Sequence, residues 1–140
     1  MKAVHFSLEE LVDRDTFGTY GEKAWELLHP QAVTAIDGIR EFFGLPVTVN
    51  SWKWDGEFQY RGYRPPHCGI GAPQSYHRRG MAFDFDVKHY SAEKVRQMIL
   101  EQQDSPLLRN IMRLEADVAW VHMDIGNIPR GRDRIYLFKA

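Results

Sequence analysis

The sequence has little of what usually stabilises a small secreted domain or a membrane protein. Its 140 residues include a single cysteine, so no disulfide bond can form within the chain. A metal site rich in thiolates is excluded for the same reason, and any metal site must use imidazole and carboxylate groups. No run of residues approaches the roughly 20 apolar residues of a membrane-spanning helix, so we expect no membrane insertion.

The chain also lacks a large net charge of either sign. It carries 18 basic and 19 acidic side chains, which leaves a net charge of −1 with the histidines neutral. A broad positive field for nucleic acids or anionic membranes is therefore missing, and we expect no nucleic-acid partner. No heptad pattern or large apolar surface stripe indicates self-association, so the expected state is a monomer.

What is present is the composition of an ordinary globular protein. Hydrophobic residues make up 44% of the chain and charged residues 26%, and a length of 140 residues suits a single domain, residues 1–140. Residues 1–6 are mixed in character and contain no apolar core, unlike a signal peptide. We therefore expect synthesis in the cytoplasm without a leader.

Local patterns predict an α+β domain, with two or three helices packed on a small antiparallel sheet. Helices are predicted where a capping residue precedes a helical apolar period, namely from Ser7, from His29 to Gly44 and from Ser91 to about Asp104. Strands are predicted at residues 47–49, 81–87, 111–114, 119–125 and 134–138. Residues 17–21 are predicted to form a loop. Residues 52–75 lack a regular pattern, and a loop of this length is usually functional.

Three side chains form a suitable set of metal ligands. His77 precedes the predicted strand at 81–87, Asp84 lies on the polar face of that strand, and His122 lies on the polar face of another. Two imidazoles and one carboxylate suit Zn²⁺ and leave a fourth position open for water, whose pKa zinc lowers toward ~7. Asp86 lies on the same face as Asp84 and is a candidate to orient a ligand.

Two motifs surround these residues. Residues 75–84 follow the pattern S-x-H-x-x-G-x-A-x-D, and residues 120–124 follow the pattern W-V-H-x-D. Together they resemble the M15-type zinc peptidases, the D-alanyl-D-alanine carboxypeptidase group. That group includes phage endolysins, and the hedgehog signalling domain shares its fold. The resemblance extends from about Phe6 to Phe138, and residues 6–10 and 69–73 also look like that family.

The resemblance implies one zinc ion per chain, with His77, Asp84 and His122 as its ligands. It implies a hydrolase that cleaves a peptide bond in peptidoglycan stem peptides, as a D,D-carboxypeptidase or an endopeptidase. The implied setting is phage or prophage lysis of the cell wall, after another factor releases the protein from the cytoplasm. The alternative is a binding or phage structural module of the same fold that keeps zinc without catalysis.

The sequence departs from the family at the catalytic base. Many relatives carry a Glu or Asp three residues before the last histidine ligand, where this chain has Ala119. We favour Glu115 as the base, because it would end a strand beside the site if residues 116–118 form a tight turn. Asp124 and Asp117 are the other candidates.

The resemblance also suggests substrate-binding residues, namely Arg61, Arg64 and Ser75. An arginine fork suits a substrate carboxylate or a developing oxyanion. Arg64 matches the family's local motif in residues 62–65, whereas Arg61 fits the count back from Gly71. Both arginines therefore remain candidates.

Overall fold

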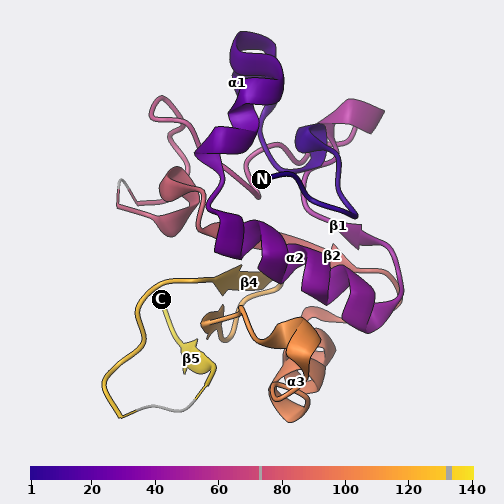
Figure 1. Cartoon of the computed structure of the whole chain (residues 1–140), viewed down its shortest axis with the longest axis vertical. Coiled ribbons are helices and arrows are strands. Elements are labelled where there is room, and N and C mark those ends of the chain that lie inside the picture. The colour runs from indigo at the N-terminus through magenta and orange to yellow at the C-terminus, as the bar shows by residue number, and fades with distance from the viewer. Residues whose placement is uncertain (73, 132–133) are drawn as a thin grey trace.

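The computed structural model describes residues 1–72, 74–131 and 134–140. Within these residues a five-stranded mixed sheet forms the centre of an α+β fold (Figure 1). This confirms the predicted fold class. Pro73, the last residue of the segment 69–73 that resembles the family, lies outside the described residues.

The strands lie close to their predicted positions. They are β1 (Val47–Thr48), β2 (Ala82–Val87), β3 (Arg113–Glu115), β4 (Val121–Asp124) and β5 (Tyr136–Phe138). Their order across the sheet is β1-β2-β4-β3-β5. The first four strands pair antiparallel, as predicted, whereas β5 pairs parallel with β3 at the edge of the sheet. Two parallel strands cannot be joined by a tight turn, and the chain between β3 and β5 passes through β4.

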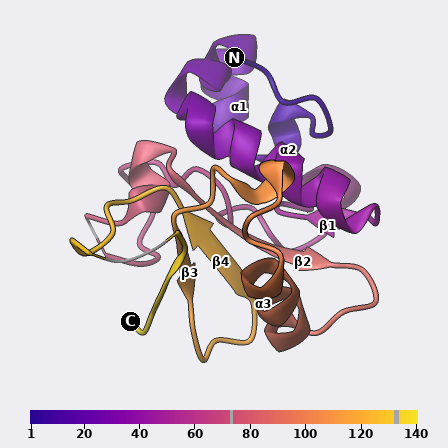
Figure 2. The same cartoon turned by 60° about the horizontal axis from the view of Figure 1, so that its bottom comes forward.

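The helices include three α-helices in the described part of the chain. These are α1 (Arg14–Tyr20), α2 (Pro30–Phe43) and α3 (Ala92–Glu101). Short 3-10 helices occur at η1 (Leu8–Glu10), η2 (Gly21–Leu27), η3 (Trp52–Trp54), η4 (Tyr76–Arg79) and η5 (Pro106–Leu108). Helices α2 and α3 both contact β2, and α2 lies across the top of the sheet in Figure 2. No described helix has the length and apolar character that crossing a membrane requires.

The sheet has an apolar and a polar face, as the alternation in residues 81–87 predicts. Phe83 and Phe85 of β2 are fully buried. They belong to one core with apolar side chains of α2 and α3, namely Ile36, Ile39, Val95 and Ile99. Asp84 and Asp86 alternate with the two phenylalanines along β2. The core therefore lies on the helix side of the sheet, and the opposite face carries the acidic side chains.

Capping residues define helix ends where the sequence predicts them. The Gln31 N–H donates to His29 Nδ1 at 3.1 Å, just before the first turn that begins at Pro30. Helix α2 ends at Gly44, whose φ of +64° is the left-handed conformation that glycine adopts without strain. Ser91 caps α3 through its hydroxyl, which accepts from the backbone of the first turn.

The predicted loop at residues 17–21 is wrong, because α1 occupies most of this segment. The Asp13 carboxylate accepts a hydrogen bond from the Thr16 N–H at 3.0 Å and caps the helix. Both Asp13 and Thr16 are buried. The segment contains Gly18 and few apolar residues, so it has no helical period. The capping residue Asp13 was the one local indication of a helix.

Apart from η3, the described residues of the long loop before η4 are irregular, as predicted. This loop runs beside β2, because the Asp84 N–H donates to the Arg61 carbonyl at 2.7 Å, and Arg64 of the same loop lies 3.3 Å from the Asp84 carboxylate. The loop thereby covers Asp84, which is only 6% exposed. A carboxylate on the polar face of a strand is thus buried by a segment more than twenty residues earlier in the sequence.

Candidate metal centre

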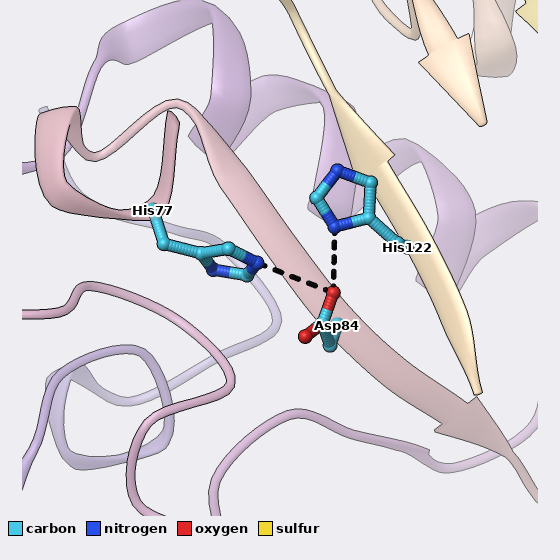
Figure 3. A group of neighbouring side chains, drawn as sticks. All are labelled: His77, Asp84 and His122. Atoms are coloured by element: carbon cyan, nitrogen blue, oxygen red, sulfur yellow. Dashed lines mark hydrogen bonds and ion pairs between the residues drawn. The ribbon is translucent and has the colours of Figure 1, made fainter. Parts of the chain in front are cut away.

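The three predicted metal ligands converge on the polar face of the sheet (Figure 3). Asp84 of β2 and His122 of β4 are directly paired across the two strands. Asp84 Oδ1 lies 2.7 Å from His122 Nδ1 and 3.3 Å from His77 Nε2. One donor atom from each residue falls within a group that spans no more than 4.8 Å. These three groups could hold one metal ion between them.

His77 is positioned by the short helix η4. The Ser75 hydroxyl caps this helix by accepting from the His77 N–H at 3.2 Å. The helix ends at Gly80 with a φ of +67°, where a Cβ would lie 2.0 Å from the Leu27 carbonyl oxygen, so only glycine fits. His77 Nδ1 lies 2.9 Å from the Gly62 carbonyl oxygen. This contact orients the ring and turns Nε2 toward Asp84.

Asp84 is an ionised carboxylate at the centre of the group. Burial opposes its ionisation, but hydrogen bonds from His122 and His77 hold the pKa of Asp84 well below its usual range. Its other oxygen, Oδ2, lies 3.3 Å from Arg64 Nη2. One carboxylate oxygen therefore faces the two imidazoles while the second faces a guanidinium.

The outer nitrogen of His122 contacts the buried carboxylate of Asp124. His122 Nε2 lies 2.9 Å from Asp124 Oδ2. Arg113 donates to both oxygens of Asp124, from Nε at 2.8 Å and from Nη2 at 3.0 Å. The Gly126 N–H donates to Oδ1 at 2.9 Å. Asp124 therefore holds the His122 ring by its Nε2 edge and leaves Nδ1 facing Asp84, as outer-shell carboxylates do at metal sites.

Arg113 is a site residue that the sequence analysis missed. It is paired with Asp124 across β3 and β4, and its guanidinium lies 4.0 Å from the ring centre of Phe138 on β5. The same guanidinium lies 5.2 Å from the ring centre of Tyr76. The two strands predicted at residues 111–114 and 119–125 were the available signal, but their pattern does not specify the register that pairs Arg113 with Asp124.

Asp86 does not orient a ligand, contrary to the prediction. It is exposed, and its Oδ2 lies 3.0 Å from Arg61 Nη1. The alternation of β2 places Asp86 on the same face as Asp84, but one step further along the strand and beyond the three ligands. The orienting contacts come instead from the Gly62 carbonyl and from Asp124.

The environment of His122 favours its protonated form. Burial acts to lower its pKa, but hydrogen bonds with Asp124 and Asp84 outweigh burial and raise the pKa of His122 to about 9. In the metal-free protein the imidazolium contributes stability below its unfolded pKa of about 6.5, and this contribution is lost as the pH rises through 9.

We expect zinc binding to release about one proton per chain at pH 7.5, because Nδ1 of His122 must lose its proton to bind a metal. The apparent zinc affinity should then rise about tenfold between pH 7 and 8 and level off above pH 9. Calorimetric titrations in buffers of different ionisation enthalpy measure the proton count. A heat of binding that is the same in every buffer would contradict the protonated His122.

A cavity of about 540 Å³ opens beside the three ligands. Glu115, the last residue of β3, lines this cavity. Burial lowers the pKa of the Arg64 guanidinium, and the negative charge of Glu115 acts against this lowering. Asp117 lies in an exposed turn, with a φ of +61° and an ion pair to Lys139 at 3.0 Å. Of the three candidate bases, Glu115 and Asp124 line the cavity.

The two candidate arginines lie in different places. Arg64 lines the 540 Å³ cavity, together with Ser75, and contacts Asp84. Arg61 lines a second cavity of about 330 Å³, which includes Asp86. Arg64 is therefore the arginine whose guanidinium contacts a ligand, whereas the guanidinium of Arg61 pairs with Asp86, two residues after Asp84 on β2.

The fold and the site belong to the class of metallopeptidase-type hydrolases, as a match to a protein-family model indicates. The family model that matches is Peptidase M15, over residues 4–124, and the chain belongs to this family. The resemblance inferred from the two motifs is confirmed. Searches of curated proteins and of solved structures returned no match. The matched region ends at Asp124, so Phe138 and the rest of β5 lie beyond it.

Proposed function

We propose that the protein is a zinc-dependent peptidase that hydrolyses a peptide bond in peptidoglycan stem peptides. The observation that carries the proposal is the convergence of His77, Asp84 and His122, whose donor atoms lie within 4.8 Å of one another. Membership of the Peptidase M15 family supports the peptidase class. The setting would be phage or prophage lysis, with a monomer reaching the cell wall after release from the cytoplasm.

The donor set fits a catalytic zinc ion. Two imidazole nitrogens and one carboxylate oxygen make three protein ligands, which is the number that leaves a position open in catalytic zinc sites. The second nitrogen of each imidazole already has a partner, Gly62 for His77 and Asp124 for His122. Bound zinc supplies Lewis acidity toward the scissile carbonyl and the attacking water.

In this proposal Glu115 is the general base. It lines the cavity beside the ligands, and its side chain has no hydrogen bond or ion pair among the described residues, so its carboxylate is free to accept a proton. It takes the proton from water as the water oxygen attacks the carbonyl carbon. It then gives this proton to the leaving amine as the C–N bond breaks. Asp124 is less suited, because Arg113, Gly126 and His122 already occupy both of its oxygens.

Arg64 and Ser75 are proposed to position the substrate at the same cavity. Arg64 Nε donates to the Tyr60 carbonyl at 2.8 Å and Nη2 contacts Asp84, which fixes the plane of the guanidinium. A fixed fork of this kind suits a substrate carboxylate or the developing oxyanion. Ser75 contributes a hydroxyl at the cavity wall, in addition to capping η4.

Digestion of purified peptidoglycan tests the proposed function. We expect the zinc-loaded protein to release stem-peptide fragments that mass spectrometry detects, each cleavage adding one water. A chelator should stop the release and zinc should restore it. Release of terminal D-alanine alone would define a carboxypeptidase, and internal cleavage an endopeptidase. Intact peptidoglycan with no effect of zinc would overturn the proposal.

The second candidate function is a binding or phage structural module that keeps zinc without catalysis. The observation that favours it is Ala119, whose methyl group replaces the acidic side chain that many relatives carry and cannot transfer a proton. The same digestion separates the two candidates. A protein that holds one zinc ion, binds peptidoglycan and leaves it uncut would be the non-catalytic module.

A further inference from the structure

A second cavity adjoins the first along the polar face of the sheet. It has a volume of about 330 Å³ and shares Asp84 and Trp120 with the cavity at the metal centre. Its other lining residues are Phe58, Arg61, Asp86 and Ala119. A peptide bound at the metal centre can therefore place a neighbouring side chain in this second cavity.

The second cavity presents one cation and one anion side by side. Arg61 Nη1 lies 3.0 Å from Asp86 Oδ2. The guanidinium also lies 4.2 Å from the ring centre of Phe58, which fixes its plane. Its side chain is 11% exposed, whereas that of Asp86 is 53% exposed. The pair is thus anchored on the arginine side and open to solvent on the carboxylate side.

The ion pair joins only one nitrogen of Arg61 to one oxygen of Asp86. The Nε and Nη2 groups of Arg61 have no hydrogen-bond partner among the described residues, and neither does Oδ1 of Asp86. A carboxylate can accept from the spare N–H groups of Arg61 while an ammonium on the same carbon donates to Asp86. Trp120, which is 42% exposed, offers an apolar surface for the methylene groups that lead to such an end.

We propose that the Arg61–Asp86 cavity is a specificity subsite for a substrate side chain that ends in an amino-acid zwitterion. Among stem-peptide residues, diaminopimelate has this chemistry, since its side chain ends in an ammonium and a carboxylate on one carbon. A lysine side chain offers only the ammonium, and amidated diaminopimelate lacks the carboxylate. The inference rests on the proposed function for the choice of stem peptides.

Binding of three matched peptides tests the subsite without requiring cleavage. The probes are N-acetylated stem tetrapeptides that differ only in the third residue, which is diaminopimelate, its side-chain amide or lysine. Binding to the metal-free full chain is followed through the indole N–H resonance of Trp120. We expect the diaminopimelate peptide to bind about tenfold tighter than the other two, as one charge-assisted contact allows.

Two variants separate a subsite from a structural ion pair. Arg61→Met should weaken only the diaminopimelate peptide, to the level of its amide, whereas Asp86→Asn should weaken all three, since each carries the ammonium. Lys88→Met, an exposed cation further along the chain that lines neither cavity, should change none of them. Equal affinity for the three peptides, or an equal loss for all three in Arg61→Met, would overturn the subsite. Cleavage by the zinc-loaded protein is measured separately, so a failure of the proposed function is distinguished from a failure of the subsite.

Discussion

Glu115→Gln is expected to lower the hydrolysis of stem peptides by a factor of about 10² to 10⁴ while the protein still binds one zinc ion per chain. The amide is nearly the same size as the carboxylate but cannot accept the proton of the attacking water. Because the Glu115 side chain has no hydrogen-bond partner among the described residues, its replacement should leave the fold and the three ligands unchanged. Cleavage rates and metal content, measured on the same preparation, check both halves of this expectation.

Asp117→Asn is the matched control for this variant. Asp117 lies two residues further along the chain, at the exposed turn between β3 and β4, and pairs with Lys139. The control removes one negative charge from the same hairpin and should keep nearly full activity. If Glu115→Gln were fully active, the base would have to be reassigned, and Asp124 would be the next residue to test.

His122→Ala is expected to lose both the zinc ion and the activity. Apparent zinc-binding free energies of roughly 10–16 kcal/mol are shared among about four ligands, so losing one should weaken binding by at least about a hundredfold. The change also leaves Asp84 and Asp124 buried without a shared partner, so a lower thermal unfolding temperature is expected. His122→Gln, which keeps a hydrogen-bonding side chain, separates the loss of zinc from a loss of the fold.

His67→Ala is the matched control for the histidine. His67 belongs to a second group of potential ligands, with Asp13 and Asp15, in which His67 and Asp15 are exposed. If the zinc ion binds at His77, Asp84 and His122, removing His67 should leave the stoichiometry at one. Loss of zinc in His67→Ala with retention in His122→Ala would place the metal at the other group.

Local sequence was sufficient for most of the helices and strands. The capping residues His29 and Ser91 and the glycine after α2 lie where the structure has helix ends. The alternation of β2 identified which side chains share a face, because neighbouring side chains of a strand point to opposite sides. Helix α1 was missed because its capping contact with Asp13 replaces an apolar period as the stabilising feature.

The contacts that orient the candidate site could not be predicted in the same way. Arg113 meets Asp124, and Asp124 meets His122, only because β3 and β4 pair in one particular register. A shift of one residue would turn Arg113 to the opposite face of the sheet. The parallel pairing of β5, which brings Phe138 against Arg113, depends on a connection with no local pattern.

The sequence by itself determined the chemistry available to this protein. A single cysteine left imidazole and carboxylate as metal ligands, and two motifs identified the peptidase family that the family model confirms. The tertiary structure decided which charges meet. It buried Asp84 beneath a distant loop, bonded Asp124 to His122, and placed Asp86 with Arg61 instead of beside the ligands. Motifs record residue types and spacing along one chain, whereas these contacts depend on how separate strands and loops pack together.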